Sequence, residues 1–75
     1  MGDIKVLKAM GYKHAYGVMV ALQQTHRFNY IKDETGLTSY SLNMSLKDLR
    51  MANLVEKRGR EYHLTSKGQR ALELA

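Results

Sequence analysis

Residues 28–65 read FNYIKDETGLTSYSLNMSLKDLRMANLVEKRGREYHLT, and this stretch decides the fold. Its apolar residues first recur every three or four positions, as on one face of a helix, and after Asn53 they follow a shorter period. Gly36 and Gly59 interrupt the pattern at two points where a tight turn favours a glycine. The stretch therefore predicts a short helix, a turn, a longer helix and a tight hairpin, in that order.

Two helices are expected on either side of the first glycine, over about residues 29–35 and 38–52. Asn29 is predicted to be the N-cap of the first helix, and Thr38 or Ser39 that of the second, because short polar side chains accept hydrogen bonds from the first free backbone N–H groups. The second helix has leucines at positions i, i+4 and i+7, which predicts its buried face. These leucines are Leu42, Leu46 and Leu49.

The segment after Asn53 reads as two short strands, over residues 54–57 and 61–64, with a glycine at the tip of the hairpin. Glu56 and Glu61 stand near the base of this hairpin, and we expect them to form ion pairs across the two strands. The tip itself concentrates positive charge, in the residues Lys57, Arg58 and Arg60.

Further elements are expected on both sides of this stretch. Helices are predicted over residues 3–10 and about 12–24, and a minimal strand over 26–28. A final helix is predicted over about 66–74, with Thr65 as its cap. The expected fold is mainly α with a small β-hairpin, in the order α-α-(β)-α-α-β-β-α, and residues 1–75 are expected to form a single domain.

Composition narrows the possible partners. The 75 residues carry a net charge of +5 and have a sequence pI near 9.7, as is typical of small nucleic-acid-binding domains. There is no cysteine, and no apolar run approaches the roughly 20 residues of a membrane span. We therefore expect a cytoplasmic protein that does not enter a membrane.

Four motifs in this order resemble those of the winged helix-turn-helix superfamily, in particular the small prokaryotic and archaeal regulators of the MarR/ArsR/PadR-like group. The matching motifs are Thr35–Thr38, Leu46–Leu49, Asn53–Gly59 and Tyr62–Gly68. The resemblance covers about residues 12–70 and implies a DNA-binding transcriptional regulator. Its helix-turn-helix would span about 29–52, and its wing about 54–64. Relatives usually have glycine where this chain has Asn53. After glycine, asparagine adopts a left-handed backbone conformation most readily, so we expect the same turn here.

The resemblance implies that helix 38–52 enters the major groove and that the basic segment 57–60 lies in the minor groove or on phosphates. Side chains in the first half of the helix are expected to contact bases, and the more polar or basic side chains are expected to contact phosphates. The candidates for bases are Tyr40, Asn43 and Met44. The candidates for phosphates are Ser39, Ser41, Lys47 and Arg50 on the helix, and Lys57, Arg58 and Arg60 on the wing.

Two other functions remain open at this stage. The same scaffold serves in other proteins as a protein–protein interaction module, and a basic surface also suits a non-specific architectural nucleic-acid binder. An enzyme is not expected, because the three histidines are far apart in the sequence and no phosphate-binding glycine loop is present. The sequence suggests no metal, no cofactor and no small-molecule effector. Pairing of the helices expected at 3–10 and 66–74 would give a homodimer.

Overall fold

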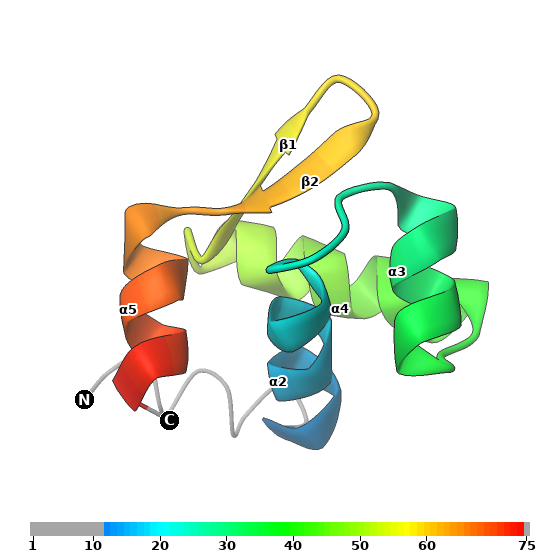
Figure 1. Cartoon of the computed structure of the whole chain (residues 1–75), viewed down its shortest axis with the longest axis horizontal. Coiled ribbons are helices and arrows are strands. Elements are labelled where there is room, and N and C mark those ends of the chain that lie inside the picture. The colour runs from blue at the N-terminus through cyan, green and yellow to red at the C-terminus, as the bar shows by residue number, and fades with distance from the viewer. Residues whose placement is uncertain (1–11, 75) are drawn as a thin grey trace.

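Four helices and one two-stranded antiparallel hairpin make up the part of the chain that the structure describes (Figure 1). The structure is a computed structural model, and it describes residues 12–74. The helix expected over residues 3–10 lies outside this range. The helices are α2 (Tyr12–Ala21), α3 (Phe28–Thr35), α4 (Ser39–Met51) and α5 (Ser66–Leu74), and the strands are β1 (Val55–Arg58) and β2 (Glu61–Leu64).

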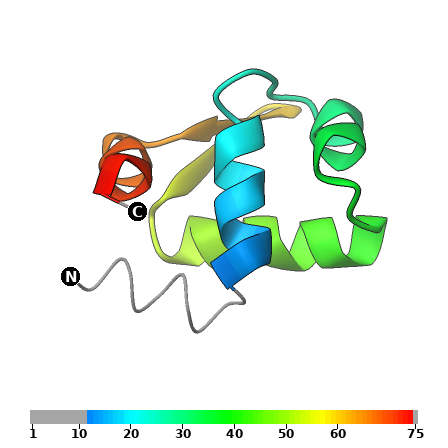
Figure 2. The same ribbon diagram turned by 60° about the horizontal axis from the view of Figure 1, so that its bottom comes forward.

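Helix α2 is the centre of the fold. It crosses α4 and lies between α3 and α5, as the two views of the chain show (Figures 1 and 2). Val18, Met19 and Leu22 are fully buried on or just after this helix, where they join the three leucines of α4 in one hydrophobic cluster. The predicted buried face of α4 is therefore confirmed. Residues of every helix and of the hairpin contribute to the same cluster.

Helix α2 ends at Ala21, three residues earlier than predicted. The next residues form a turn in which the N–H groups of Gln23 and Gln24 donate to the carbonyls of Val20 and Ala21, at 3.1 and 3.0 Å. Hydrogen bonds that reach back only three residues tighten the last turn and satisfy carbonyls that the helix itself leaves unpaired. Residues 22–24 are leucine and two glutamines, which a helix also accommodates, so the sequence pattern did not indicate that the helix ends at Ala21.

The corner between α3 and α4 depends on Gly36 and Thr38. Gly36 has φ +69°, in the left-handed region that glycine adopts without steric cost, and its N–H donates to the carbonyl of Lys32. The Thr38 side chain then accepts a hydrogen bond from the Ser41 N–H, at 3.1 Å. The turn and the cap of α4 are as predicted.

The predicted cap of α3 is wrong. Helix α3 begins at Phe28 and its N-cap is Arg27, which makes no side-chain capping bond, while Asn29 lies exposed inside the helix. The reason is a tertiary contact that precedes the helix. Arg27 forms an antiparallel bridge with Glu61, and the Tyr62 N–H donates to the His26 carbonyl at 2.8 Å. This pairing fixes the extended backbone at Arg27, and the helix begins directly after it. The minimal strand predicted at 26–28 is present as this single bridge.

Asn53 has φ +61° and makes the left-handed turn that leads from α4 into the hairpin, as predicted. The strands then pair with Val55 opposite Leu64 and Arg58 opposite Glu61. Two residues are left for the loop, and the first of them, Gly59, has φ +60°. A positive φ at the first loop residue is what a type II′ turn requires, and this turn matches the twist of the strands.

Helix α5 is fastened to the same turn. The Thr65 hydroxyl donates to the Asn53 carbonyl at 2.6 Å and accepts from the Gly68 N–H at 3.0 Å, so it caps α5 as predicted and holds the turn as well. Lys67 Nζ donates to the Ala52 carbonyl at 3.1 Å. Gly68 is buried directly against the Leu54 backbone, where a Cβ atom would collide with the carbonyl group. The start of α5, which follows the hairpin, is therefore held against the turn that precedes the hairpin.

Candidate nucleic-acid interface

The outer face of α4 carries large side chains that point away from the core. Tyr40, Met44 and Lys47 lie opposite the buried leucines, and Met51 continues the same stripe one turn further along. Tyr40 and Met51 are each 75% exposed, and Met44 is 42% exposed. A helix of a small domain would normally place such side chains against a neighbour, so this face is available for a partner.

The flank of α4 next to this stripe is polar. Ser39, Asn43 and Arg50 are all exposed and follow one another at helical spacing, so they share that side of the helix. Ser41 lies on the other flank and is half-buried, which leaves it less able to reach a phosphate than its neighbours. Ser45, which the sequence analysis did not single out, is buried at 7% exposure among the leucines.

A groove of about 550 Å³ runs between the second half of α4 and β1. We call it the α4–β1 groove. It brings together three of the predicted phosphate ligands, with Lys47 and Arg50 on one wall and Lys57 on the other. None of the three forms an ion pair with any residue that the structure describes. The remaining residues that line it are Met51, Asn53, Val55 and Glu56.

The hairpin tip holds two of the other predicted ligands, Arg58 and Arg60, beyond the groove. Arg58 forms an ion pair with Glu56, two residues before it on the same strand, whereas Arg60 is exposed and pairs with no acidic group among residues 14–74. Lys57 lies with its Nζ 5.6 Å from the ring centre of Tyr62, its partner across the hairpin. The positive charge of the tip is therefore partly compensated at Arg58 and uncompensated at Arg60.

The expected ion pairs across the strands are wrong, because both acidic residues pair within their own strand. Glu56 pairs with Arg58, and Glu61 with His63 at 3.0 Å. Side chains two residues apart point to the same face of a strand, so they meet without help from the partner strand. The hydrogen bond with His63 lowers the pKa of the Glu61 carboxyl below its ordinary value, and the charges of His26 and Arg27 add to this effect.

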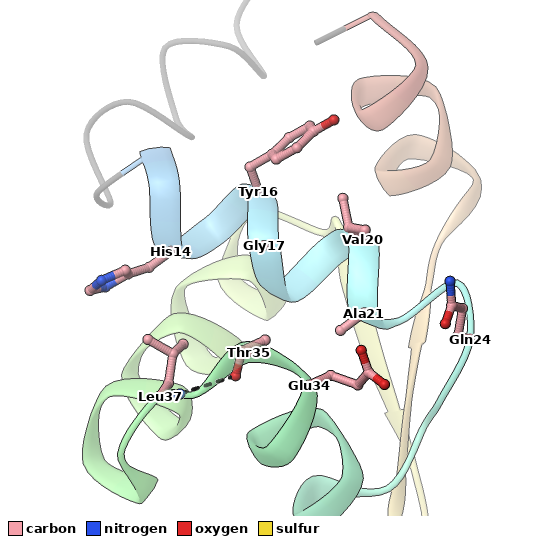
Figure 3. A pocket seen from close by; sticks show the side chains of 9 residues that line it. All are labelled: His14, Tyr16, Gly17, Val20, Ala21, Gln24, Glu34, Thr35 and Leu37. Carbon is pink, nitrogen blue, oxygen red and sulfur yellow. Dashed lines mark hydrogen bonds between the residues drawn. The ribbon is translucent and has the colours of Figure 1, made fainter.

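Two features of this region were not predicted. The first is that the rings of His26 and His63 stack on one another where the α2–α3 loop meets β2. No signal in the sequence connects the two histidines, because their contact follows from the register of the bridge at Arg27. The second is a hollow of about 340 Å³ between α2 and the α3–α4 corner (Figure 3). Figure 3 also shows the bond from the Leu37 N–H to the Thr35 hydroxyl at this corner.

The hollow between α2 and α3 is chemically unlike the α4–β1 groove. Neither lysine nor arginine is among the nine residues that line it, and Glu34 adds a negative charge. The hollow therefore offers phosphate neither lysine nor arginine, and the nucleic-acid candidates all belong to α4 and the hairpin. Among them, the α4–β1 groove unites Lys47, Arg50 and Lys57. The base candidates lie nearer the start of α4, and Arg58 and Arg60 lie at the tip.

Within residues 14–74, no group of three or more His, Cys, Asp or Glu side chains has the arrangement of a metal site. The helices that the structure describes are too short and too polar to cross a membrane. Comparisons of the chain with protein-family models, with curated proteins and with solved structures found no significant match.

Proposed function

We propose that this protein is a winged helix-turn-helix transcriptional regulator that binds double-stranded DNA. In this proposal α3 and α4 are the helix-turn-helix, α4 enters the major groove, and the β1–β2 hairpin is the wing that contacts the minor groove or its phosphates. The order of the elements supports this assignment, as does the left-handed glycine between α3 and α4.

The observation that carries the proposal is the α4–β1 groove. It collects three cationic side chains from two elements far apart in the sequence, and none of them is neutralised by an ion pair with a described residue. Cations that line one groove without ion-pair partners are favourable when they face phosphates. A helix with exposed polar and apolar side chains next to such a groove suits an interface in which the helix contacts the bases and the groove contacts the DNA backbone.

The test is the anisotropy of a fluorescently labelled DNA duplex, titrated with the protein at several salt concentrations. We expect binding that weakens steeply as salt rises, because each phosphate contact releases counterions. Lys47→Ala and Arg50→Ala should weaken binding and reduce the salt dependence. Arg70→Ala removes the same charge from the exposed surface of α5, outside the groove, and should leave both unchanged. Absence of binding at low salt would exclude the proposal.

A second candidate function is a winged-helix module that binds another protein. The exposure of Tyr40, Met44 and Met51 favours it, because large apolar side chains on one helix face are common at protein interfaces. Such a module would bind its partner with little dependence on salt and would not bind DNA. A non-specific architectural binder would instead bind all duplexes equally well.

Homodimerisation is a separate part of the proposal. A dimer would place two copies of α4 about 34 Å apart, in successive major grooves on one side of the duplex. Sedimentation at micromolar protein concentration measures it directly, and a monomeric mass with and without DNA would contradict it.

A further inference from the structure

We infer that α4 reads A·T base pairs, with thymine methyl groups contacted by Met44 and Tyr40 and adenine bound by Asn43. This inference rests on the proposed function, since it names the base pairs that the same interface would select. It follows from which side chains α4 presents in its first two turns and from which it lacks there.

The first two turns of α4 carry no charged side chain. Residues 39–46 read SYSLNMSL, and Lys47 is the first cation of the helix, about 12 Å along the axis from its start at the usual rise per residue. Guanine is normally recognised through its two major-groove acceptors by arginine or lysine, and the amino group of cytosine by aspartate or glutamate. The part of α4 that would face base edges therefore lacks the charged side chains that single out a G·C pair, and its serines can bond to either kind of pair.

The side chains that are present suit adenine and thymine. Asn43 is exposed, and an asparagine amide can donate to N7 and accept from the amino group of adenine. Met44 and Tyr40 lie one turn apart on the same face, at 42% and 75% exposure, and offer an apolar surface for the thymine methyl group. Leu42, Ser45 and Leu46 are buried in the core and are not available to DNA.

The wing adds a preference of a different kind. Narrow minor grooves of A·T-rich DNA attract arginine, so Arg60 would favour such duplexes by their shape. A comparison of A·T with G·C duplexes therefore cannot separate the wing from α4. The methyl group can, because it lies only in the major groove and its removal leaves charge and base pairing unchanged.

The test uses three labelled duplexes of equal length and identical charge: alternating adenine–thymine, the same duplex with deoxyuridine in place of thymine, and alternating guanine–cytosine. The contacts that each duplex offers recur every two base pairs, so the experiment needs no known operator. We expect the thymine duplex to bind most tightly. Loss of the methyl groups should weaken binding about fourfold for each methyl group that the protein buries.

Two matched variants assign the effect to residues. Met44→Ala should reduce the ratio of affinities for thymine and deoxyuridine duplexes towards one. Met51→Ala makes the same chemical change on the same face, in the last turn of α4. Met51 lines the α4–β1 groove, so this variant controls for the ratio and not for affinity: whatever it does to the binding of both duplexes, the ratio should stay that of the parent. Folding of both variants is checked by circular dichroism.

The outcomes separate the inference from the function on which it rests. Equal binding of the thymine and deoxyuridine duplexes by the parent overturns the reading of thymine, while DNA binding itself stands. A preference for the guanine–cytosine duplex overturns it as well. If no duplex binds at low salt, the inference fails together with the proposed function.

Discussion

The imidazole rings of His26 and His63 stack with their centres 4.1 Å apart and their planes 17° apart. His63 also bonds to the Glu61 carboxylate, and the backbone of the same loop pairs with β2 through Arg27 and Tyr62. The loop after α2 is thus held against the hairpin by the stacked rings, by the Arg27–Glu61 bridge and by the backbone hydrogen bond from Tyr62 to His26.

This arrangement predicts a dependence on acid. The pKa of Glu61 is lowered in the folded protein, so between the folded and unfolded values the unfolded chain binds more protons. The stability that the Glu61–His63 bond contributes is therefore complete above the ordinary carboxyl value of about 4.3 and is lost as the pH falls through the lower, folded value. In His63→Ala, we expect the pKa of Glu61 to rise towards its ordinary value, as measured by a carboxyl NMR titration. His14→Ala, on the exposed side of α2, is the control, and an unchanged Glu61 titration in His63→Ala would show that the bond does not cause the shift.

Gly68 should not tolerate a side chain. A methyl group there would meet the Leu54 carbonyl, which cannot move without disturbing the turn between α4 and β1. We expect Gly68→Ala to lower the free energy of unfolding by about 1–3 kcal/mol. Gly17→Ala is the matched control, because Gly17 also lies in a helix but has open space where its Cβ would be. It should raise stability by up to about 1 kcal/mol through helix propensity. Thermal melts measure both, and a similar effect of the two changes would contradict the packing of α5.

Asn53 is predicted to accept glycine but not alanine. Its φ of +61° costs an ordinary L-residue about 1–2 kcal/mol, whereas glycine adopts it freely. The free energy of unfolding of Asn53→Gly should therefore lie within a few tenths of a kcal/mol of that of the parent, and that of Asn53→Ala should be lower by about 1 kcal/mol. Urea denaturation measures the difference. Equal stability of the two variants would mean that the turn does not depend on this conformation.

The ion pair between Glu56 and Arg58 should weaken DNA binding. Arg60→Ala is expected to reduce the slope of log Kd against log salt by about one unit, the contribution of one phosphate contact. Arg58→Ala should reduce it less, because Glu56 already compensates that charge. Glu56→Gln should strengthen binding, since it frees Arg58 and removes a negative charge from the α4–β1 groove. Weaker binding by Glu56→Gln would mean that the ion pair positions Arg58 for DNA.

Asn43→Ala should relax the preference for one base pair rather than weaken binding to all duplexes. If Asn43 binds adenine, its loss costs about 1–3 kcal/mol on the preferred duplex and little on others. Replacing adenine by 7-deazaadenine removes the N7 acceptor and should weaken binding by the parent but not by Asn43→Ala. A variant that discriminates between the duplexes as the parent does would show that Asn43 does not read a base.

The elements that follow from local chemistry could be predicted from the sequence. Gly36, Asn53 and Thr65 have their expected roles because a left-handed turn or a helix cap depends on one residue and its immediate neighbours. The leucines of α4 were identified for a similar reason, since helical period alone sets which side of a helix is buried. The hairpin and the cationic residues on it belong to the same class of local signal.

Features that depend on contacts between distant segments were missed. Arg27 rather than Asn29 precedes α3, because a backbone bridge to β2 fixes the chain there. The stacking of His26 and His63 results from the same bridge. The α4–β1 groove is similar, because its residues were proposed singly and only the packing of β1 beside α4 brings them to one surface.

The double role of Thr65 has a thermodynamic consequence for binding. Its hydroxyl joins the beginning of the hairpin to the start of α5, and the Tyr62 N–H fastens the second strand to the α2–α3 loop. Both strands are thus ordered when the chain folds, before any partner arrives. The conformational entropy of the hairpin backbone is lost on folding rather than on association, so DNA bound at the α4–β1 groove, as proposed above, would retain more of its contact energy as affinity.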